Sequence, residues 1–503
     1  MTSTPHNPVL AGFHPDPSIV RVGDAFFLAT SSFEYLPGIP IHRSTDLNTW
    51  ELVGHVATRD GQLALRDAWT GAGAWAPTLR HHDGRFWLVI TVVGQGCLVF
   101  SALDAAGPWS DPVVLGDVQG IDPDLAWDEE GTCYLTYSGL MVAGGDFEHG
   151  KAHMGIQQVR VDLATGEVLE RPRSLWSGTG GMFPEAPHLY RIGDVWYLML
   201  AEGGTERGHA VTIARSESPM GPFESCPHNP VLTARGTDRP VQNTGHGDLV
   251  QGPDGEWHLF CLGVRTRGMT RAFSPMGRET FATPVRWEHG WPVVEPVRLS
   301  PPATAESVRE DFESPRLPSW ALGIRRFVRE FASLTERPGW LVISNDGSTM
   351  GDLRPTCVAG RQRHERMRIT TLVDAAEGVG GLALRIDEFQ WAQIVVGDGT
   401  ITARVRLHEI HQEVSIPFPG SVSLLRIHTS DPRMDEGRPS GPDTVTLAYL
   451  DGDQEVPLLS FDGRYLSAEV GESFVGRAFG LVAAKGVVAF DWIEYTGVDA
   501  PRP

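Results

Sequence analysis

Hydrophobic and polar positions alternate along most of the chain, and the alternating runs come in pairs. Residues 16–32, DPSIVRVGDAFFLATSS, consist of a short alternating run, a Gly-Asp turn and a second run rich in aromatic residues. Alternation with a period of two is typical of a strand with one buried face, and a Gly/Asp turn between two such runs indicates a β-hairpin. We therefore expect an antiparallel hairpin near the start of the chain.

This hairpin pattern occurs five times within the first 300 residues. The copies begin at Asp16, Ala76, Asp122, Ala186 and His246. These starts are 46 to 64 residues apart, which is more than one hairpin needs, and the rest of each copy fits two further strands. Four strands per repeat at this period predict a five-bladed β-propeller. A linear β-solenoid is the alternative, but its repeats are shorter and it would leave open sheet edges at both ends.

The pattern changes after residue 300. Residues 301–310 begin a passage rich in Pro, Ser and Glu that lacks alternation, which predicts a linker. Alternating runs separated by short Gly/Asp turns return in residues 311–503, as in RMRITTLVDA and VVAFDWIEYTG, and this pattern is typical of a β-sandwich. The chain is therefore predicted to be all-β, with a propeller in residues 1–300 and a sandwich in residues 311–503.

Composition and charge limit the kinds of molecule that the protein is expected to bind. A chain of 503 residues with 57 Gly and 37 Pro suits a turn-rich protein of at least two domains. The net charge of −21 repels nucleic acid and anionic membranes but is indifferent to a neutral sugar. The absence of a basic N-terminal segment, a signal-like apolar run and any stretch near the ~20 apolar residues of a membrane span predicts a cytoplasmic protein. Five scattered cysteines predict buried free thiols in a reducing compartment.

The propeller geometry turns the repeat alignment into a spatial prediction. The innermost strand of each blade runs along the central axis, so equivalent residues at the starts of these strands surround one opening. Asp16 and Asp122 hold this position in the first and third copies, Glu185 immediately precedes it in the fourth, and His246 holds it in the fifth. A single Asp before a hairpin is most often a turn residue, but three carboxylates in register predict a shared pocket.

Two carboxyl groups, one protonated and one ionised, are what glycoside hydrolysis requires. The apolar residues around Glu185 in GGMFPEAPHLY favour its protonated form, so it suits the general acid. Asp16 then suits the base that deprotonates water, and its flanking prolines fix the backbone direction. Asp122 is expected to hold Glu185 protonated through its charge. Asp124 and Asp248, two positions further along their repeats, are interpreted as capping or hairpin residues.

Other side chains near the inner strands are candidates for sugar contacts. Phe33 and Trp75 are expected either to stack on a sugar ring or to belong to the core between blades. Arg265 and Arg267 follow the inner hairpin of the fifth repeat and are expected either to bind sugar hydroxyls or to lie on the surface. His246 fits three roles: a substrate contact, an axial cation ligand or a buried core histidine.

Several motifs follow one another in order between residues 6 and 297, among them NPVLAGFHPDPSI, WAP, FPEAPHLY, AEGGTERGHAVTIARS and GRETF. Together they resemble glycoside hydrolase family 43 in its β-xylosidase branch. The region after residue 305 resembles the concanavalin A-like sandwich of jelly-roll type that is appended to those enzymes. The resemblance implies an inverting mechanism, with Asp16 as general base, Glu185 as general acid and Asp122 as modulator of the acid's pKa.

The resemblance also implies a substrate. It points to an exo-acting enzyme that hydrolyses β-1,4-xylosidic bonds at the non-reducing ends of neutral xylo-oligosaccharides. An α-L-arabinofuranosidase or a dual enzyme is the alternative, because the two sugars present similar hydroxyl positions. A non-catalytic sugar-binding propeller is a third hypothesis, against which the three carboxylates argue. Similar enzymes are often homo-oligomers; no cofactor is required, although some family members hold calcium on the axis through a histidine that His246 matches.

Overall fold

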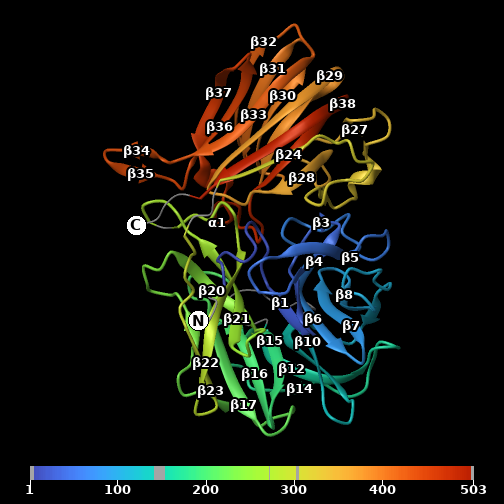
Figure 1. Ribbon diagram of the computed structural model, residues 1–503, viewed down its shortest axis with the longest axis vertical. Helices are drawn as coiled ribbons and strands as arrows, with labels where there is room; N and C mark the ends of the chain where they lie inside the picture. Colours follow the sequence, from blue (N-terminus) through green and yellow to red (C-terminus); the bar gives the residue numbers. More distant parts are fainter. Residues whose placement is uncertain (1–4, 141–152, 271, 302–304, 500–503) are drawn as a thin grey trace.

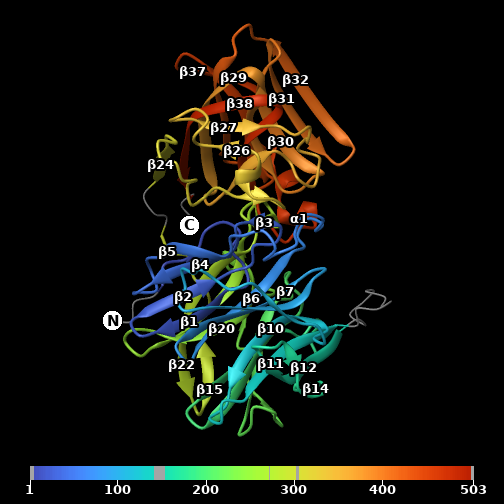
Figure 2. The same cartoon turned by 90° about the vertical axis from the view of Figure 1, so that its right-hand side faces the viewer.

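The computed structural model describes residues 5–140, 153–270, 272–301 and 305–499 and is built almost entirely of β-strands. Two bodies are stacked along its long axis, with the N-terminal body below and the C-terminal body above in Figure 1. The view turned by 90° in Figure 2 separates the same two bodies. The predicted all-β class is confirmed, and so is the division into a propeller and a sandwich.

The lower body is a propeller of five antiparallel sheets whose strands follow chain order. Blade 1 consists of β1 (Ser18–Val22), β2 (Ala25–Ala29), β4 (Gly38–Ser44) and β5 (Glu51–Ala57). Blade 2 consists of β6 (Ala74–His82), β7 (Arg85–Val92), β8 (Gly96–Ala102) and β9 (Val113–Leu115). Blade 3 consists of β10 (Gly120–Trp127), β11 (Cys133–Leu140), β12 (His153–Asp162), β13 (Glu167–Val168) and β14 (Arg173–Ser174). Blade 4 consists of β15 (Glu185–Ile192), β16 (Val195–Glu202), β17 (Ala210–Ser216), β18 (Glu224–Ser225) and β19 (Leu232–Thr233). Blade 5 consists of β20 (Val241–Gln251), β21 (Trp257–Arg265), β22 (Glu279–Glu288) and β23 (Trp291–Val294).

The residue that starts each repeat has the same unusual backbone conformation in all five blades. The φ angles are 56° at Asp16, 42° at Ala76, 53° at Asp122, 49° at Ala186 and 50° at His246. In blades 2 to 5 the pairing of the inner strand with its neighbour shifts register at this same point. A bulge of this kind bends the strand and re-aims a side chain. Because a non-glycine residue with positive φ costs about 1–3 kcal/mol, its fivefold repetition marks the feature that directs these positions to the axis.

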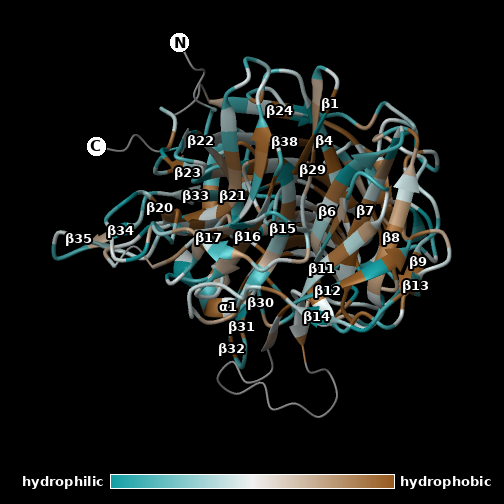
Figure 3. Cartoon of the chain, turned by 90° about the horizontal axis from the view of Figure 1, so that it is seen from below, coloured by the Kyte–Doolittle hydropathy of each residue, from teal (hydrophilic) through white to brown (hydrophobic). Residues whose placement is uncertain are grey.

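Apolar side chains hold the blades together. The aliphatic residue three positions after each repeat start, namely Ile19, Leu79, Leu125, Leu189 or Leu249, is buried in a cluster between blades. Between blades 5 and 1, Ile19 and Phe26 pack against Val250 and Phe260, so the ring is closed. Figure 3, seen from below, shows brown hydrophobic segments on many strands, interspersed with white and teal segments.

The upper body is a two-layered sandwich built around two long strands, β29 (Arg366–Arg385) and β38 (Ala478–Val498). Their mutual pairing shifts register between Asp374 and Glu377, so each strand passes from one layer to the other. One layer adds β24 (Glu306–Glu310), β33 (Val422–Ser430), β36 (Thr444–Asp451) and β37 (Gln454–Asp462). The other adds β28 (Cys357–Arg361), β30 (Gln390–Gly397), β31 (Thr400–Leu407) and β32 (Ile410–Pro417), while β26 (Ala332–Ser333) and β27 (Leu341–Ser344) pair at the side.

The boundary between the two bodies differs from the predicted one. Residues 302–304 of the predicted linker lie outside the described residues, but residues 306–310 already form β24, which pairs with β38. The linker was predicted too long because the strand ESVRE is almost wholly polar and shows no alternation that marks a buried face. A short antiparallel pair, β3 (Tyr35–Leu36) with β25 (Gly323–Ile324), joins the propeller directly to the sandwich.

Two smaller predictions can also be compared with the structure. All five cysteines are buried and free, as the sequence predicted. Among the described residues, no helix combines the length and apolar character needed to cross a bilayer. The polar hairpin of β34 (Arg433–Asp435) and β35 (Arg438–Ser440) projects sideways from the sandwich in Figure 1.

Candidate active site

The three carboxyl residues singled out in the sequence line one cavity of about 320 Å³. Asp16 precedes β1, Asp122 lies in β10 and Glu185 begins β15, so blades 1, 3 and 4 each contribute one residue. Asp16 and Asp122 are buried, whereas Glu185 is partly exposed. The positive φ at Asp16 and Asp122, and at Ala186 beside Glu185, is the local conformation that brings these distant segments to one opening.

Asp16 is surrounded by hydrogen-bond donors and positive charge. Ser31 donates from Oγ to one carboxylate oxygen at 2.5 Å, and Arg278 Nη1 lies 3.2 Å from the other. His246 Nδ1 is 3.5 Å from Asp16 Oδ1. Burial alone raises the pKa of Asp16, but the attraction of Arg278, with smaller effects of His246 and Ser31, outweighs burial and leaves the pKa below its ordinary value. Asp16 is therefore ionised at neutral pH.

Asp122 and Glu185 have the opposite preference. Burial, followed by repulsion from Asp16, raises the pKa of Asp122 to about 7, even though Asp122 Oδ2 accepts a hydrogen bond from the backbone N–H of Ala186 at 3.1 Å. Burial, then the charges of Asp122 and Asp16, raise the pKa of Glu185 well above its ordinary value. Because these two groups titrate together, the pair retains at least one proton near neutral pH.

The loop that leads to Glu185 is held by a buried carboxylate. Glu202, at the end of β16, accepts backbone hydrogen bonds from Thr179 at 2.9 Å and from Gly181 at 2.8 Å. Gly178 has a φ of +87°, and a Cβ there would lie within 2.3 Å of the Glu202 carboxyl carbon. The loop can therefore close on Glu202 only with glycine at this position, and it delivers Glu185 to the cavity in a defined direction.

Aromatic rings form the apolar wall of the cavity. Phe33 and Trp75, the two predicted sugar-stacking residues, both line it. Phe474, from the segment between α1 (Ala468–Gly471) and β38, lines it as well. The Phe474 ring is stacked with Phe33 at 6.4 Å between centroids and meets Trp75 edge-on at 5.7 Å. The sandwich thus completes a cavity whose acids belong to the propeller.

Two histidines face the carboxylates from blades 4 and 5. His246 lines the cavity and burial lowers its pKa to about 3, so its imidazole is neutral. His209, also in the wall, has a pKa lowered to about 4, again by burial. Within the part of the chain that is described, no group of three or more His, Cys, Asp or Glu side chains is arranged to hold a metal ion. The calcium ion that the resemblance allowed on the axis, held through His246, stays a prediction.

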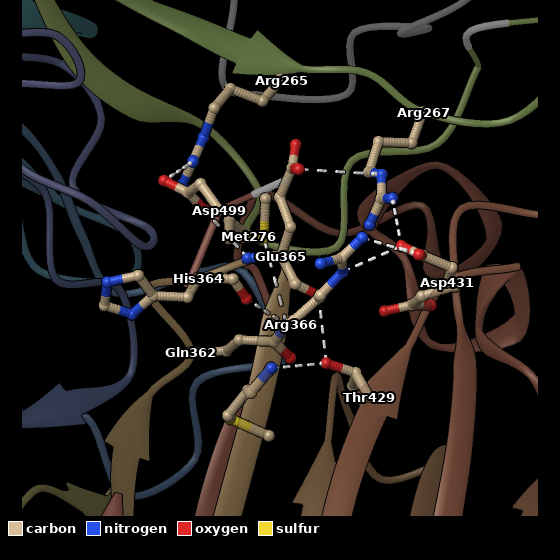
Figure 4. Close-up of polar contacts among 12 residues, drawn as sticks. Arg265, Arg267, Met276, Gln362, His364, Glu365, Arg366, Thr429, Asp431 and Asp499 are labelled. Carbon is tan, nitrogen blue, oxygen red and sulfur yellow. Dashed lines mark hydrogen bonds and ion pairs between the residues drawn. The ribbon is translucent and has the colours of Figure 1, made fainter. Parts of the chain in front are cut away.

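The predicted sugar contacts of Arg265 and Arg267 are corrected by the structure, because neither residue lines this cavity. Arg265 pairs with Glu279 at 2.7 Å and with Asp499 at 2.7 Å, so it joins the propeller to the last residues of the sandwich (Figure 4). Arg267 lies 4.0 Å from Glu365 and 3.6 Å from Asp431. Both are interdomain ion-pair residues, a role that depends on partners far away in the sequence.

The arginine that does reach the carboxylates is Arg278. Its guanidinium contacts Asp16, donates to Thr205 Oγ1 at 3.0 Å and lies 5.1 Å from the ring centre of Phe474. Arg278 belongs to the GRETF motif, so a signal was present in the sequence, but it lies outside the inner strands from which the site was deduced. His209 also lies in a quoted motif, AEGGTERGHAVTIARS, but away from the repeated axial position, whereas Phe474 lies in none of the quoted motifs.

The interpretation of Asp124 and Asp248 as capping or hairpin residues is also corrected. Both side chains are completely buried and pair with Arg80, at 2.7 Å and 3.2 Å respectively. Arg80 also contacts Ser18 and His188, so its pairing with Asp124 and Asp248 places both carboxyl groups between the inner strands.

The arrangement can be compared with known proteins. The profile described as "Glycosyl hydrolases family 43" matches residues 5–292, and "Beta xylosidase C-terminal Concanavalin A-like domain" matches residues 309–496. A relative from Bacteroides ovatus, "Non-reducing end alpha-L-arabinofuranosidase BoGH43B", is 39% identical over 98% of this chain and 95% of its own length. A "Beta-xylosidase" from Bacillus subtilis is 34% identical over 73% of this chain and 74% of its own.

A solved structure extends the likeness to the whole chain. The crystal structure of a xylan beta-1,4-xylosidase from Bacillus halodurans superimposes with a TM-score of 0.87 at 29% identity, covering 98% of this chain and 99% of that one. Both domains and their order along the chain are therefore shared. The chain accordingly belongs to glycosyl hydrolases family 43, a family of glycoside hydrolases, and carries the concanavalin A-like domain of β-xylosidases at its C-terminus.

Proposed function

We propose that this chain is an inverting exo-glycosidase that hydrolyses β-1,4-xylosidic bonds at the non-reducing ends of xylo-oligosaccharides. The feature that carries the proposal is one cavity whose carboxyl groups differ in proton affinity: the pKa of Asp16 is lowered, whereas the pKa values of Asp122 and Glu185 are raised, so that this pair retains a proton. An inverting glycosidase needs one carboxylate and one carboxylic acid on opposite sides of the bond.

In the proposed reaction, Glu185 gives its proton to the glycosidic oxygen as the bond from that oxygen to the sugar C1 breaks. Asp16 takes a proton from a water molecule whose oxygen bonds to C1 from the opposite face. The products are xylose with inverted anomeric configuration and a shortened oligosaccharide. Asp16 is then protonated and Glu185 ionised, and proton exchange with solvent restores both.

Neighbouring groups support these roles. The positive charge of Arg278 keeps Asp16 ionised, and Arg278 also lines the cavity, where a guanidinium group is suited to donate hydrogen bonds to a sugar hydroxyl. Asp122 raises the pKa of Glu185 through its charge, which suits a modulator of the acid. A cavity of about 320 Å³ is at the small end of the range for ligand sites. It is suited to one terminal sugar, which favours exo action.

Hydrolysis of α-L-arabinofuranosides is a second candidate activity. It is favoured by the identity with the B. ovatus relative, which is named an arabinofuranosidase and matches almost the whole chain. Turnover of 4-nitrophenyl β-D-xylopyranoside and 4-nitrophenyl α-L-arabinofuranoside should be compared on one enzyme preparation. We expect the larger kcat/KM on the xyloside; negligible xyloside hydrolysis with rapid arabinofuranoside hydrolysis would reverse the assignment.

The stereochemistry gives an independent test. Proton NMR during the first minutes of xyloside hydrolysis should detect α-xylose before mutarotation produces the β anomer. Initial release of β-xylose would mean retention, and Asp16 would then have to act as a nucleophile.

A catalytic role is distinguished from mere sugar binding by Glu185→Gln. The amide keeps the shape of the side chain but cannot give up a proton in the same way, so kcat on an unactivated xylo-oligosaccharide should fall about 100-fold or more. The matched control is Glu206→Gln, because Glu206 also lines the cavity but has no role in the proposed proton transfers. Undiminished activity of the Glu185 variant would contradict the acid assignment.

We also propose the setting of the activity. Five buried free thiols and a net charge of −21 suit a cytoplasmic enzyme that acts on small neutral oligosaccharides. Assembly into a homo-oligomer stays a prediction, which light scattering coupled to size-exclusion chromatography would test.

A further inference from the structure

A second layer of polar side chains lies on the propeller axis beneath the catalytic carboxyl groups. Every blade contributes to it, and the residues lie two to four positions further along the inner strands than the repeat starts. We call this group the axial ring; its members are Ser18, Arg80, Asp124, His188, Tyr190 and Asp248.

Arg80 is the centre of the axial ring. Its Nη2 lies 2.7 Å from Asp124 Oδ1 and 2.9 Å from His188 Nδ1. Its Nη1 lies 3.2 Å from Asp248 Oδ2 and 3.3 Å from Ser18 Oγ. One guanidinium group therefore contacts the inner strands of blades 1, 3, 4 and 5 from its own position on blade 2. Since a guanidinium only donates hydrogen bonds, His188 Nδ1 must accept here.

The ring binds backbone groups that the sheets leave unpaired. Each inner strand is the edge of its sheet, so part of its N–H groups lack a partner in the ladder. Asp248 Oδ2 accepts from the N–H of Ile19 at 2.9 Å, and Asp124 Oδ2 accepts from the N–H of Leu189 at 2.7 Å. Tyr190, whose hydroxyl donates to Asp248 Oδ1 at 2.5 Å, accepts from the N–H of Leu249 at 3.1 Å.

The two carboxylates of the ring need a cation. Their side chains have no solvent exposure, and the side chain of Arg80 is only 13% exposed. A buried carboxylate without a positive partner costs several kcal/mol. Burial opposes the ionisation of Asp248, yet the charge of Arg80 is the main effect that overcomes burial and lowers the pKa of Asp248 to about 2. Arg80 thus supplies the charge that keeps this acceptor ionised.

The ring and the catalytic layer are parts of the same strands. Ser18 is two residues after Asp16, Asp124 is two residues after Asp122, and His188 is three residues after Glu185. The rings of His188 and His246 are 6.2 Å apart, and His246 Nδ1 in turn lies 3.5 Å from Asp16. A change in the ring therefore moves the strand ends that carry the catalytic carboxyl groups.

We propose that the guanidinium group of Arg80 is the axial cation of this propeller: it holds the inner strands at the spacing that the three carboxyl groups require. Arg80 is a positioning residue, because it acts through Asp124, Asp248 and His188. Unlike a metal ion, it remains charged and attached under all conditions in which the chain is folded.

The first test is chelation of the wild-type protein. Dialysis against EDTA, followed by addition of calcium, should change neither kcat nor the melting temperature, because the axial charge belongs to the chain. Loss of stability on chelation that calcium restores would overturn the proposal. This measurement of stability does not depend on the proposed function, so its failure is distinguishable from failure of the glycosidase assignment.

The second test compares Arg80→Lys with Arg80→Met. The expected result, which does rest on the proposed function, is that Met lowers kcat about tenfold or more with less than about threefold change in KM, while Lys recovers a large part of the kcat because it keeps the charge. Arg85→Met, a substitution on the same hairpin outside the ring, is the matched control. Equal effects of Lys and Met on kcat would overturn the proposal.

A third variant covers the case in which Arg80→Met does not fold. Arg80→Ala leaves space at the axis, and millimolar guanidinium chloride should raise its melting temperature and kcat relative to the same concentration of sodium chloride. The proposal would be overturned if guanidinium rescued neither the melting temperature nor the kcat of Arg80→Ala, and if Arg80→Lys melted like the wild type only in the presence of calcium. The axis would then require a metal ion instead.

Discussion

At the scale of single residues, the site depends on how charges divide the protons among three carboxyl groups. Arg278 outweighs the effect of burial at Asp16, whereas burial and the neighbouring carboxylates reinforce each other at Asp122 and Glu185. Like charges in a confined site disfavour simultaneous ionisation. The same arrangement that prepares an acid and a base therefore reduces the stability of the fold.

The role of Asp122 can be tested through the pH dependence of kcat/KM. Asp122→Asn removes a negative charge that raises the pKa of Glu185, so Glu185 should lose its proton at lower pH. The basic limb of the profile is expected to move down by about one pH unit, with kcat/KM at the optimum reduced about 10- to 100-fold. A basic limb at the wild-type position or above it would contradict the modulator role.

Glu185 should also affect stability in a pH-dependent way. Its pKa is higher in the folded than in the unfolded state, so its contribution to stability is fully present below the unfolded value near 4.3 and is lost as the pH rises through the folded value. Glu185→Gln should therefore be more stable than the wild type by about 1 kcal/mol at pH 8.5, and this advantage should be smaller at pH 5. Urea unfolding at the two pH values measures this; a difference that shrinks with rising pH would refute it.

At the scale of structural elements, the position of one loop of the sandwich decides whether the cavity is closed. Phe474 lies between α1 and β38 and stacks with Phe33 of the propeller. Gly476, two residues later, approaches the backbone of Met276 so closely that a Cβ would lie 2.1 Å from its carbonyl oxygen. The loop can approach the propeller because this position has no side chain.

Gly476→Ala should therefore displace Phe474 from the cavity. We expect kcat/KM to fall about tenfold, mainly through a higher KM, because the apolar wall is lost while the three carboxyl groups remain in place. The matched control is Gly116→Ala, where a Cβ meets no atom within 4 Å and φ is not positive. Equal kinetics of the two variants would show that the loop tolerates a methyl group.

At the scale of the whole molecule, buried neutral histidines make the free energy of unfolding decrease at acidic pH. Burial lowers the pKa of His14 well below 6.5, that of His42 and His246 to about 3, and that of His209 to about 4. The stability that these neutral histidines contribute is fully present above pH 6.5. It is lost as the pH falls toward their pKa values in the folded state. Carboxyl groups with a raised pKa act in the opposite direction. Among the described residues there are five of these, Glu34, Asp122, Glu185, Glu279 and Asp387. The histidines with a lowered pKa are seven, because His55, His258 and His364 join the four named above.

The free energy of unfolding should consequently decrease from pH 6.5 to pH 4, with each histidine contributing up to about 1.4 kcal/mol per pH unit. Chemical denaturation at half-unit intervals measures the slope. His42→Gln should make the slope shallower because Gln takes up no proton. A constant free energy of unfolding over this range would be inconsistent with neutral burial of these side chains.

The sequence by itself determined the features that depend on local order. Each repeat contains its own hairpin, turn and axial residue, so the alignment of five copies was sufficient for the number of blades and for the meeting of Asp16, Asp122 and Glu185. For Phe33 and Trp75 the sequence left two alternatives, stacking on a sugar or packing between blades, and the structure places both in the wall of the cavity. These predictions succeeded because strand alternation and repeat position are properties of neighbouring residues.

Only the tertiary structure decided which partners the long charged side chains reach. Arg265 ends β21, the second strand of blade 5, and Arg267 follows it, yet both pair with residues of the sandwich, whereas Arg278 contacts Asp16. Phe474 enters the cavity from the other domain. An arginine extends several ångströms from its backbone and pairs with whichever acid the docking of distant segments brings near it, and that docking is fixed by the packing of both domains together.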